Sequence, residues 1–329
     1  MPGAVLNVVR RAPSLRFLTI HTCLGAEFSP AFVGRLVACA PRLLALETDA
    51  YAPTADEACA LLRNNAPFGT VRLRRLHVSL KDTGADGIQR ASDGVQRIAS
   101  QLAFRHSSLR ELTLESDWMP VANAFSALVD ALITLRLVAL SFIGSLLVSI
   151  GGAASHIVRL ANGSSLSCLA INGSSSLTVP LLSVRALSLA ASLRACQTLT
   201  SLTLFAVGLW SGASPACGNA IVASLVGHPT LRALDLGSNH VSGKHRDAVC
   251  ARLFAANTPA LSTLLVSGCS MGDKGLLPLF CALLGNTFLR ELDCSYNYGG
   301  VCDKAPRSAS HVLDDVTANS TLTALRLST

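Results

Sequence analysis

The fold is decided by three segments that repeat one pattern: TLRALDLGSNHV (residues 230–241), ALSTLLVSGCSM (260–271) and FLRELDCSYNYG (288–299). Aligned on Leu231, Leu261 and Leu289, each reads apolar-x-x-apolar-x-apolar-x-x-Asn/Cys, and the aligned leucines lie 30 and 28 residues apart. This spacing leaves room for one short strand and one helix in each unit. Because a unit of that size cannot bury its own apolar edge, copies of it must stack on one another.

The same pattern recurs outside these segments with lower fidelity. The further copies begin at Leu15, Leu43, Leu73, Leu109, Leu137, Leu166, Leu199 and Leu322. Together with the three clear copies they make eleven starts, separated by 28 to 36 residues. Between the starts lie segments with helical periodicity; in the longest of them, Ile88, Val95, Ile98 and Leu102 are expected to form one apolar helix face.

The pattern and its period of about 29 residues resemble the leucine-rich repeat, specifically the ribonuclease-inhibitor type. The resemblance implies an α/β leucine-rich repeat solenoid (a horseshoe) with a parallel sheet on the concave side and helices on the convex side. Residues 1–329 are then expected to form a single domain of about eleven repeats, in which residues 1–14 are an N-terminal cap.

The last position of the pattern predicts a structural ladder. A buried Asn amide can satisfy backbone groups where the chain turns out of a strand, and a Cys fills the same space with weaker hydrogen bonding. The predicted members of this ladder are Cys23, Asn239, Cys269 and Asn297. The middle copies carry Lys81, Asp117, Ser145, Ser174 and Val207 instead, which predicts a distorted ladder there.

Composition narrows the class of protein. Half of the residues are hydrophobic and 14% are charged, which favours a continuous core over disorder. The net charge is +7, but the cations are not clustered with aromatic residues, so a nucleic-acid partner is not expected. Eleven cysteines, an odd number without any CxxC pair, favour free thiols in a reducing compartment, the cytoplasm, over secretion. The N-terminal arginines follow the apolar run rather than precede it, which argues against a signal peptide.

One segment has the composition of a membrane span. Residues 131–150 are apolar except for Arg136, which would cost about 2.5–3.5 kcal/mol near the centre of a bilayer. Because the repeat register places a strand at residues 137–142, we expect a buried strand and helix here and no membrane span.

Motifs for catalysis and for metal or cofactor binding are weak. Residues 82–87 with Asp93 resemble a calcium loop, but Gly84 occupies a ligand position and the last ligand is not Glu. Residues 237–244 resemble a phosphate loop that is one residue too long and is followed by His245. Both segments are better explained as turns, and the histidines are dispersed. We therefore expect no enzyme activity, cofactor or metal.

The concave face is the predicted binding surface. Its outward strand positions carry seven carboxylates against two arginines, although the chain as a whole is basic. The hypothesis is that the C-terminal strands contact Lys or Arg side chains of a partner; the alternative is that these are ordinary solvated residues. Trp118 and Trp210 are expected after strands at the rim, as partner anchors or as packed side chains. The predicted partner-binding residues are Glu111, Glu115, Asp235, Glu291, Asp293, Tyr296 and Tyr298.

Three classes of function remain after these exclusions. The first is a non-enzymatic protein-binding module or scaffold, a monomer or part of a larger complex, whose partner the sequence does not identify. The second is a regulator of an enzyme such as a small GTPase, resembling the Ran GTPase-activating proteins; the chain lacks the strongly acidic tail usual in them. The third is a membrane or secreted receptor, which would use the sequons at Asn162, Asn172 and Asn319.

Overall fold

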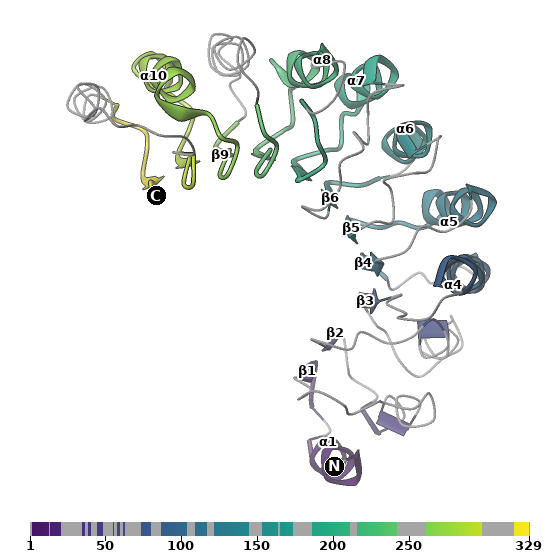
Figure 1. The fold of residues 1–329 in the computed structure, drawn as a ribbon. Coiled ribbons are helices and arrows are strands. Elements are labelled where there is room, and N and C mark those ends of the chain that lie inside the picture. The colour runs from purple at the N-terminus through teal and green to yellow at the C-terminus, as the bar shows by residue number, and fades with distance from the viewer. Residues whose placement is uncertain are drawn as a thin grey trace. The chain divides into compact units, whose positions relative to one another are not determined.

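The computed structural model describes residues 2–12, 14–20, 35–36, 39–40, 45–48, 55, 58–59, 62, 74–79, 87–103, 109–116, 122–144, 153–163, 165–173, 186–210, 216–241, 261–297 and 319–328. The chain divides into two compact units. Unit 1 comprises Met1–Gly152 with Gly163–Leu166, and unit 2 comprises Ala153–Asn162 with Ser167–Thr329. Each unit is built from parallel strands with helices on one side of them (Figure 1).

Unit 1 begins with helix α1 (Pro2–Arg10), within the predicted cap. Its described strands are β1 (Phe17–Ile20), β2 (Ala45–Thr48), β3 (Arg75–Ser79), β4 (Glu111–Ser116) and β5 (Ala139–Gly144), and its longer helices are α4 (Gly87–Leu102) and α5 (Ala122–Thr134). The strands pair in parallel in chain order, with Leu76, Leu112 and Leu140 in register. Parallel pairing requires a crossover after each strand, which the helices supply.

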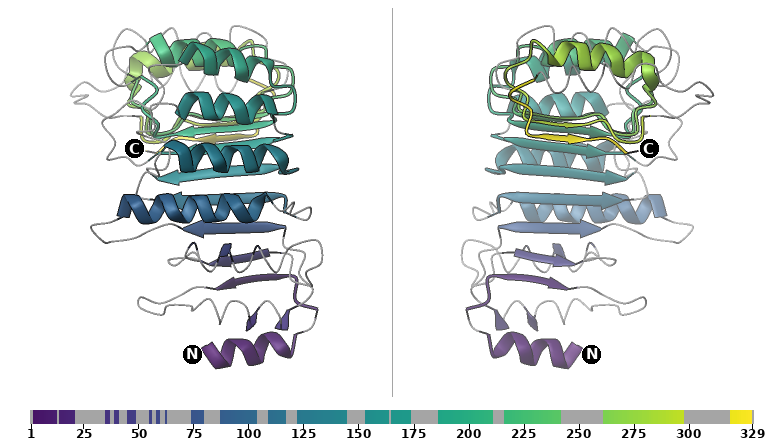
Figure 2. Two further views of the ribbon diagram at one scale, coloured as in Figure 1. Left: turned by 90° about the vertical axis from the view of Figure 1, so that its right-hand side faces the viewer. Right: turned by 90° about the vertical axis from the view of Figure 1, so that its left-hand side faces the viewer.

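Unit 2 repeats this arrangement with shorter strands. The described strands are β6 (Cys168–Asn172), β7 (Ser201–Phe205), β8 (Ala233–Asp235), β9 (Thr263–Leu265), β10 (Glu291–Asp293) and β11 (Ala324–Arg326), and the helices are α6 (Ala153–Gly163, its last residue excepted), α7 (Ala186–Ala195), α8 (Ala216–Leu225) and α10 (Gly272–Leu283). These strands also run parallel in chain order (Figure 2).

The core of unit 2 is the predicted stack of leucines. Leu202, Leu234, Leu264 and Leu292 pair in register on consecutive strands, and each is at most 1% exposed. Burial of one leucine side chain contributes about 1.5–3 kcal/mol. The aliphatic positions of each copy therefore supply the buried side of these strands. The predicted parallel α/β repeat architecture is confirmed.

Two details differ from the sequence predictions. The strand expected at residues 137–142 is β5, which begins two residues later, because the amides of Val138 and Ala139 both donate to the carbonyl of Arg110 and turn the chain there. Ile88, expected in the core, is 51% exposed. It lies in the first turn of α4, which has 16 residues and is about 24 Å long at about 1.5 Å per residue. Strand β3 has five residues and is only about 17 Å long at about 3.3 Å per residue, so the helix is longer than this strand.

The apolar segment 131–150 lies partly outside the described residues. Its first residues complete α5 and the following ones form β5, as a helix and a strand rather than one continuous helix. Among the residues that the structure describes, no helix combines the length and the apolar composition needed to cross a membrane.

Candidate functional site

The candidate site is the face of the strands opposite the helices, called here the open face. In a strand successive side chains point to opposite sides, so the residues flanking each buried leucine point away from the helices. In β8, β9 and β10 the central leucine is buried and its two neighbours are partly exposed. This alternation brings Asp235, Glu291 and Asp293 to the open face of unit 2, as the sequence predicted.

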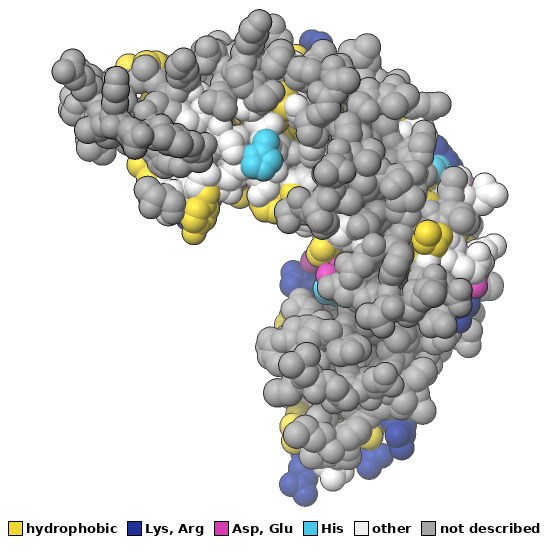
Figure 3. Space-filling model, in the orientation of Figure 1, with side chains coloured by type: hydrophobic (Ala, Val, Ile, Leu, Met, Phe, Trp, Pro, Cys, Tyr) yellow, Lys and Arg dark blue, Asp and Glu magenta, His cyan; other side chains and the backbone are white. Residues whose placement is uncertain are grey.

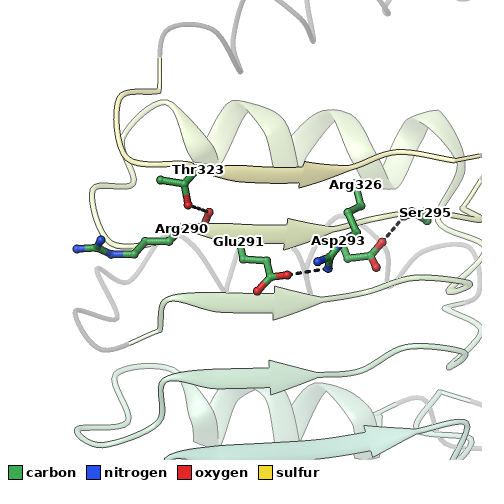
Figure 4. Close-up of polar contacts among 6 residues, drawn as sticks. All are labelled: Arg290, Glu291, Asp293, Ser295, Thr323 and Arg326. Atoms are coloured by element: carbon green, nitrogen blue, oxygen red, sulfur yellow. Dashed lines mark hydrogen bonds and ion pairs between the residues drawn. The ribbon is translucent and has the colours of Figure 1, made fainter.

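Glu291 forms an ion pair within the sheet. Its Oε1 lies 2.6 Å from Nη1 of Arg326 on the neighbouring strand β11 (Figure 4). The two side chains are 31% and 57% exposed, and an ion pair so accessible to water contributes about 0–1 kcal/mol to stability. The pair nevertheless shows that a guanidinium group fits against the carboxylates of this face.

Asp235 and Asp293 occupy equivalent positions at the ends of β8 and β10. Asp235 Oδ1 accepts a hydrogen bond from the amide of Gly237 (2.8 Å), and Asp293 Oδ1 accepts one from the amide of Ser295 (2.9 Å). Leu265 of β9 lies between them in register. Neighbouring strands are about 4.8 Å apart, so the backbones of the two aspartates are separated by about 10 Å.

Burial raises the pKa of the Asp235 carboxyl above its usual 3.8. The negative charge of Asp293 also raises this pKa, and the hydrogen bond from Gly237 lowers it. Ionised Asp235 is therefore held in an unfavourable environment that a cation would relieve.

The predicted carboxylates of unit 1 have a different environment. Glu111 Oε2 lies 2.7 Å from Nε of Arg75, and Glu115 Oε2 lies 3.4 Å from Nε2 of His77. Basic, acidic and histidine side chains accordingly meet over β3 and β4 (Figure 3). Glu111 and Glu115 are thus each matched by a cationic or ionisable group of the same unit.

Tyr296 is an exposed aromatic residue in an unusual conformation. It follows β10, is 66% exposed and has φ of 56°. The equivalent positions of three other repeats of unit 2 are Ala206 (φ 53°), Ser238 (φ 55°) and Gly268 (φ 66°), so these four turns share the left-handed region. Only glycine adopts this region without a steric cost, which is about 1–2 kcal/mol for other residues. Tyr298 lies outside the described residues.

The ladder residues sit beneath this face and are structural. Asn239 is fully buried; its Oδ1 accepts hydrogen bonds from the amides of Val207 (3.0 Å) and Leu209 (3.2 Å). Its Nδ2 donates to the carbonyls of Leu204 (2.6 Å) and Leu236 (2.9 Å). The amide thus ties the turn after β8 to the turn of the preceding repeat.

Asn297 makes the corresponding contacts one step further along the chain. Its Oδ1 accepts from the amides of Cys269 (3.0 Å) and Met271 (3.2 Å), and its Nδ2 donates to the carbonyl of Val266 (2.8 Å). Cys269 takes the ladder position between the two asparagines and donates from Sγ to the carbonyl of Leu236 (3.2 Å). Cys23 lies outside the described residues.

A second ladder, which the sequence interpretation missed, lies at the opposite end of the strands. Three residues before the first leucine of their copies, Asn286 and Asn319 each accept hydrogen bonds from two backbone amides, with the shortest contacts at 2.7 and 2.8 Å. His228 takes the same position and accepts through Nδ1 from the amide of Leu231 (3.2 Å). The recurrence of Asn or His three residues before that leucine was the available signal.

Trp210 is packed in the interior of unit 2. It is 3% exposed, and its Nε1 donates to Asn219 Oδ1 at 3.2 Å. Of the two alternatives for this residue, packing therefore holds and a partner anchor does not. Trp118 lies outside the described residues.

The described parts of the two units offer neither a metal site nor a catalytic cluster. The described residues contain no group of three or more His, Cys, Asp or Glu side chains arranged to hold a metal. A surface groove of about 930 Å³ lies between α4 and α5, on the helix side of unit 1. Small residues such as Ala99 and Ala131 line it, with Asp130 and Arg136 of opposite charge. It holds no arrangement of side chains typical of catalysis.

The comparisons with known proteins agree with this geometry. A family model described as Leucine Rich repeat matches residues 227–244, which include the first of the three clear copies. The chain carries leucine-rich repeats. The repeat fold is also that of the leucine-rich repeat-containing protein LegL7 from Legionella pneumophila, at a TM-score of 0.54 and 16% identity over 94% of this chain and 90% of that one. Together these findings identify an α/β leucine-rich repeat solenoid.

Two further matches are more limited. The repeat chain is 34% identical over 98 residues to a Caenorhabditis elegans protein named protein phosphatase 1 regulatory subunit 37 homolog. The match covers 30% of this chain and only 10% of that protein. The structure of a yeast Rad7 and Elc1 complex is similar at a TM-score of 0.49 and 14% identity, over 99% of this chain and 83% of that one; a likeness at this level supports no argument about function.

Proposed function

We propose that this leucine-rich repeat chain is a non-enzymatic protein-binding scaffold that recognises a partner through the open face of its strands. The observation that carries the proposal is the open face of unit 2. Its side chains are partly exposed, they combine carboxylates with Thr203, Phe205 and Leu265, and no described element covers them. An accessible, rigid surface of mixed polarity has the composition of a protein interface.

The repeat type and the extent of the array belong to the same proposal. In unit 2, the repeats whose strand and helix are both described each consist of one short strand and one helix. This composition is typical of the ribonuclease-inhibitor type. The repeat starts continue at separations of 28 to 36 residues through the whole sequence. This regularity supports residues 1–329 as one array of about eleven repeats, with residues 1–14, which include α1, as a cap.

The properties of the cysteines support a non-catalytic protein in a reducing compartment. Cys269 and Cys294 are buried free thiols, and burial raises the pKa of each to about 12. A thiol that stays protonated is neither a nucleophile nor a metal ligand. Free thiols are typical of the cytoplasm, where we place the protein. The sequence has no cluster of cationic and aromatic residues, which argues against nucleic acid as the partner.

A regulatory role is the second candidate, and one observation favours it. The 98-residue match is to a protein named as a regulatory subunit of protein phosphatase 1. A scaffold of this kind would hold the enzyme rather than perform its chemistry. Among enzyme partners, a protein phosphatase is therefore favoured over the small GTPase considered from the sequence.

The proposal is tested by affinity purification of the full chain from cell extract with two matched variants. Ala233→Trp places a large side chain on the open face of β8, and Ala223→Trp places the same side chain on exposed α8. We expect a partner that is enriched with the wild type and with Ala223→Trp and is lost with Ala233→Trp. If no protein is enriched with the wild type, or if both variants retain it equally, the open face is not the binding surface.

A further inference from the structure

The open face of unit 2 carries more acidic than basic side chains among its described residues. Its described positions carry three carboxylates, Asp235, Glu291 and Asp293, and one guanidinium group, that of Arg326. The chain as a whole carries a net charge of +7. A local excess of negative charge on a basic protein favours encounter with a positively charged segment of another molecule.

Among the described residues of this face, the one ion pair joins Arg326 to Glu291, although Arg326 lies in register with Asp293. Arg326 reaches Glu291 at 2.6 Å, and among the residues that the structure describes no cationic side chain lies within ion-pair distance of Asp235 or Asp293. Each aspartate uses Oδ1 to accept a backbone amide. The turn uses Oδ1 of each aspartate, and the second carboxylate oxygen can accept from a donor of another molecule.

Leu265, between the two aspartates, provides an apolar surface on which the stem of a long cationic side chain can pack. Leu265 lies in register with both and is partly exposed. Arg and Lys side chains bury their aliphatic stems on apolar surface while the charged group stays at the polar edge. With about 10 Å between the two strand backbones, one guanidinium or two adjacent cationic side chains can approach both carboxylates.

Tyr296 adds an aromatic group at the same end of β10. It comes three residues after Asp293, at the end of the strand where that aspartate lies. The neighbouring repeat has Gly268 at the equivalent position, where the left-handed conformation carries no steric cost. A strained and 66% exposed tyrosine contributes little to the fold, whereas Tyr is frequent among the residues that dominate binding energy and attracts cations to its ring.

We propose that the open face between β8 and β10 binds an arginine- or lysine-containing segment of a protein partner, with the cation between Asp235 and Asp293 over Leu265 and Tyr296 beside it. This inference rests on the proposed scaffold function and specifies the chemistry of its partner. The raised pKa of Asp235 agrees with it, because a bound cation offsets the unfavourable burial of that carboxylate.

The test uses the full chain and two fluorescein-labelled nine-residue Gly/Ser peptides. One peptide carries two arginines at alternate positions, and the other carries two citrullines, which have the same shape and no charge. Binding is measured by fluorescence anisotropy at low and at physiological ionic strength. We expect the arginine peptide to bind about tenfold tighter than the citrulline peptide, as for a charge-assisted hydrogen bond, with a preference that weakens as salt is added.

The aspartates are tested by a matched pair of double variants. Asp235→Asn with Asp293→Asn removes two charges but keeps a side-chain oxygen for the amides of Gly237 and Ser295, so the turns are retained. Glu111→Gln with Glu115→Gln removes the same charge from unit 1. The first variant is expected to lose the preference for arginine, and the second to keep it.

Tyr296→Gly tests the aromatic group, with Ser238→Gly as the control at the equivalent turn. Both replacements relieve a left-handed residue, so neither is expected to lower the melting temperature. Only Tyr296→Gly is expected to weaken binding of the arginine peptide, by several-fold.

Equal affinity for the two peptides would overturn the inference, and so would an equal loss of arginine preference in the two double variants. Self-association of the chain that the Asp235→Asn, Asp293→Asn variant abolishes would also overturn it, because a second copy of the chain would then be the occupant. A partner retained by the aspartate variant and lost by Ala233→Trp would leave the scaffold function standing and reject a basic segment as the ligand.

Discussion

Replacing Asn239 by Ala removes a side chain that makes five hydrogen bonds in the ladder, as many as Asn297 makes. Asn239 is fully buried and satisfies two backbone amides and the carbonyls of Leu204 and Leu236. A typical hydrogen bond contributes about 0.5–1.5 kcal/mol, and a buried group left unpaired costs about 1–3 kcal/mol. Because water has little access to this turn, we expect the free energy of unfolding to fall by roughly 3–5 kcal/mol.

Asn239→Cys should lower the free energy of unfolding less than Asn239→Ala does, because Cys269 already occupies the equivalent ladder position in the next repeat. At the Cys269 position the sulfur donates to the carbonyl of Leu236 at 3.2 Å, and the amide of Val241 bonds to the carbonyl of Cys269 instead of to a side chain. The cysteine therefore keeps part of the turn. The expected loss for Asn239→Cys is about 1–2 kcal/mol, since a thiol is a weak donor and acceptor.

Urea unfolding, followed by circular dichroism and by the fluorescence of Trp210 in a Trp118→Phe background, measures these losses. Trp210 is a local reporter because it is buried and directly follows Leu209, whose amide bonds to Asn239. Coincidence of the two signals checks that the repeats unfold together, as a single free energy requires. Ser262→Ala, which loses one exposed bond of 3.1 Å to the carbonyl of Arg232, is the control and should change stability by less than about 0.5 kcal/mol. A loss for Asn239→Ala no larger than that of the control would refute the reasoning.

Three other predictions follow from the same contacts. His228→Asn should keep its stability while His228→Ala loses about 1–3 kcal/mol in urea unfolding, because Asn286 makes the same backbone contacts at the equivalent position; equal losses would contradict a shared role. The raised pKa of Asp235 means that the folded chain holds this proton more readily than the unfolded chain, so the stability it contributes is full below pH 3.8 and declines as pH rises through the folded pKa. Asp235→Asn should remove this decline from the pH dependence of the unfolding free energy, and an unchanged profile would count against it. Alkylation at mildly alkaline pH, followed by mass spectrometry, should modify exposed Cys281 before Cys269, whose pKa is about 12; the reverse order would show that the buried thiol is reactive.

The positions of the strands followed from the sequence because each repeat is specified locally. Three aliphatic residues at fixed spacing, as in Leu231, Leu234 and Leu236, mark one strand whatever lies elsewhere in the chain. The turn position that carries Asn239 and Asn297 is marked by the same spacing. The same leucine register recurs between the described strands β7, β8, β9 and β10, so a local pattern is sufficient to predict this stacking.

The environment of each surface carboxylate was decided by the tertiary structure. The sequence places both Glu111 and Asp235 in outward strand positions. Arg75 lies across from Glu111 in register and pairs with it at 2.7 Å, whereas no cation of the described residues lies within ion-pair distance of Asp235. Which facing side chains come within ion-pair distance depends on their conformations in the folded sheet. Periodicity within one repeat does not contain this information.

The sequence by itself determined the repeat, the strand positions and the asparagine ladder, because they depend on spacing within one copy. Only the tertiary structure decided the hydrogen bonds from Asn319 Nδ2 to the carbonyls of Leu283 and Asn286 and the ion pair between Arg75 and Glu111. These features arise between copies that are about thirty residues apart in the chain and in contact in the sheet, where packing and electrostatics act over distance in space rather than along the sequence.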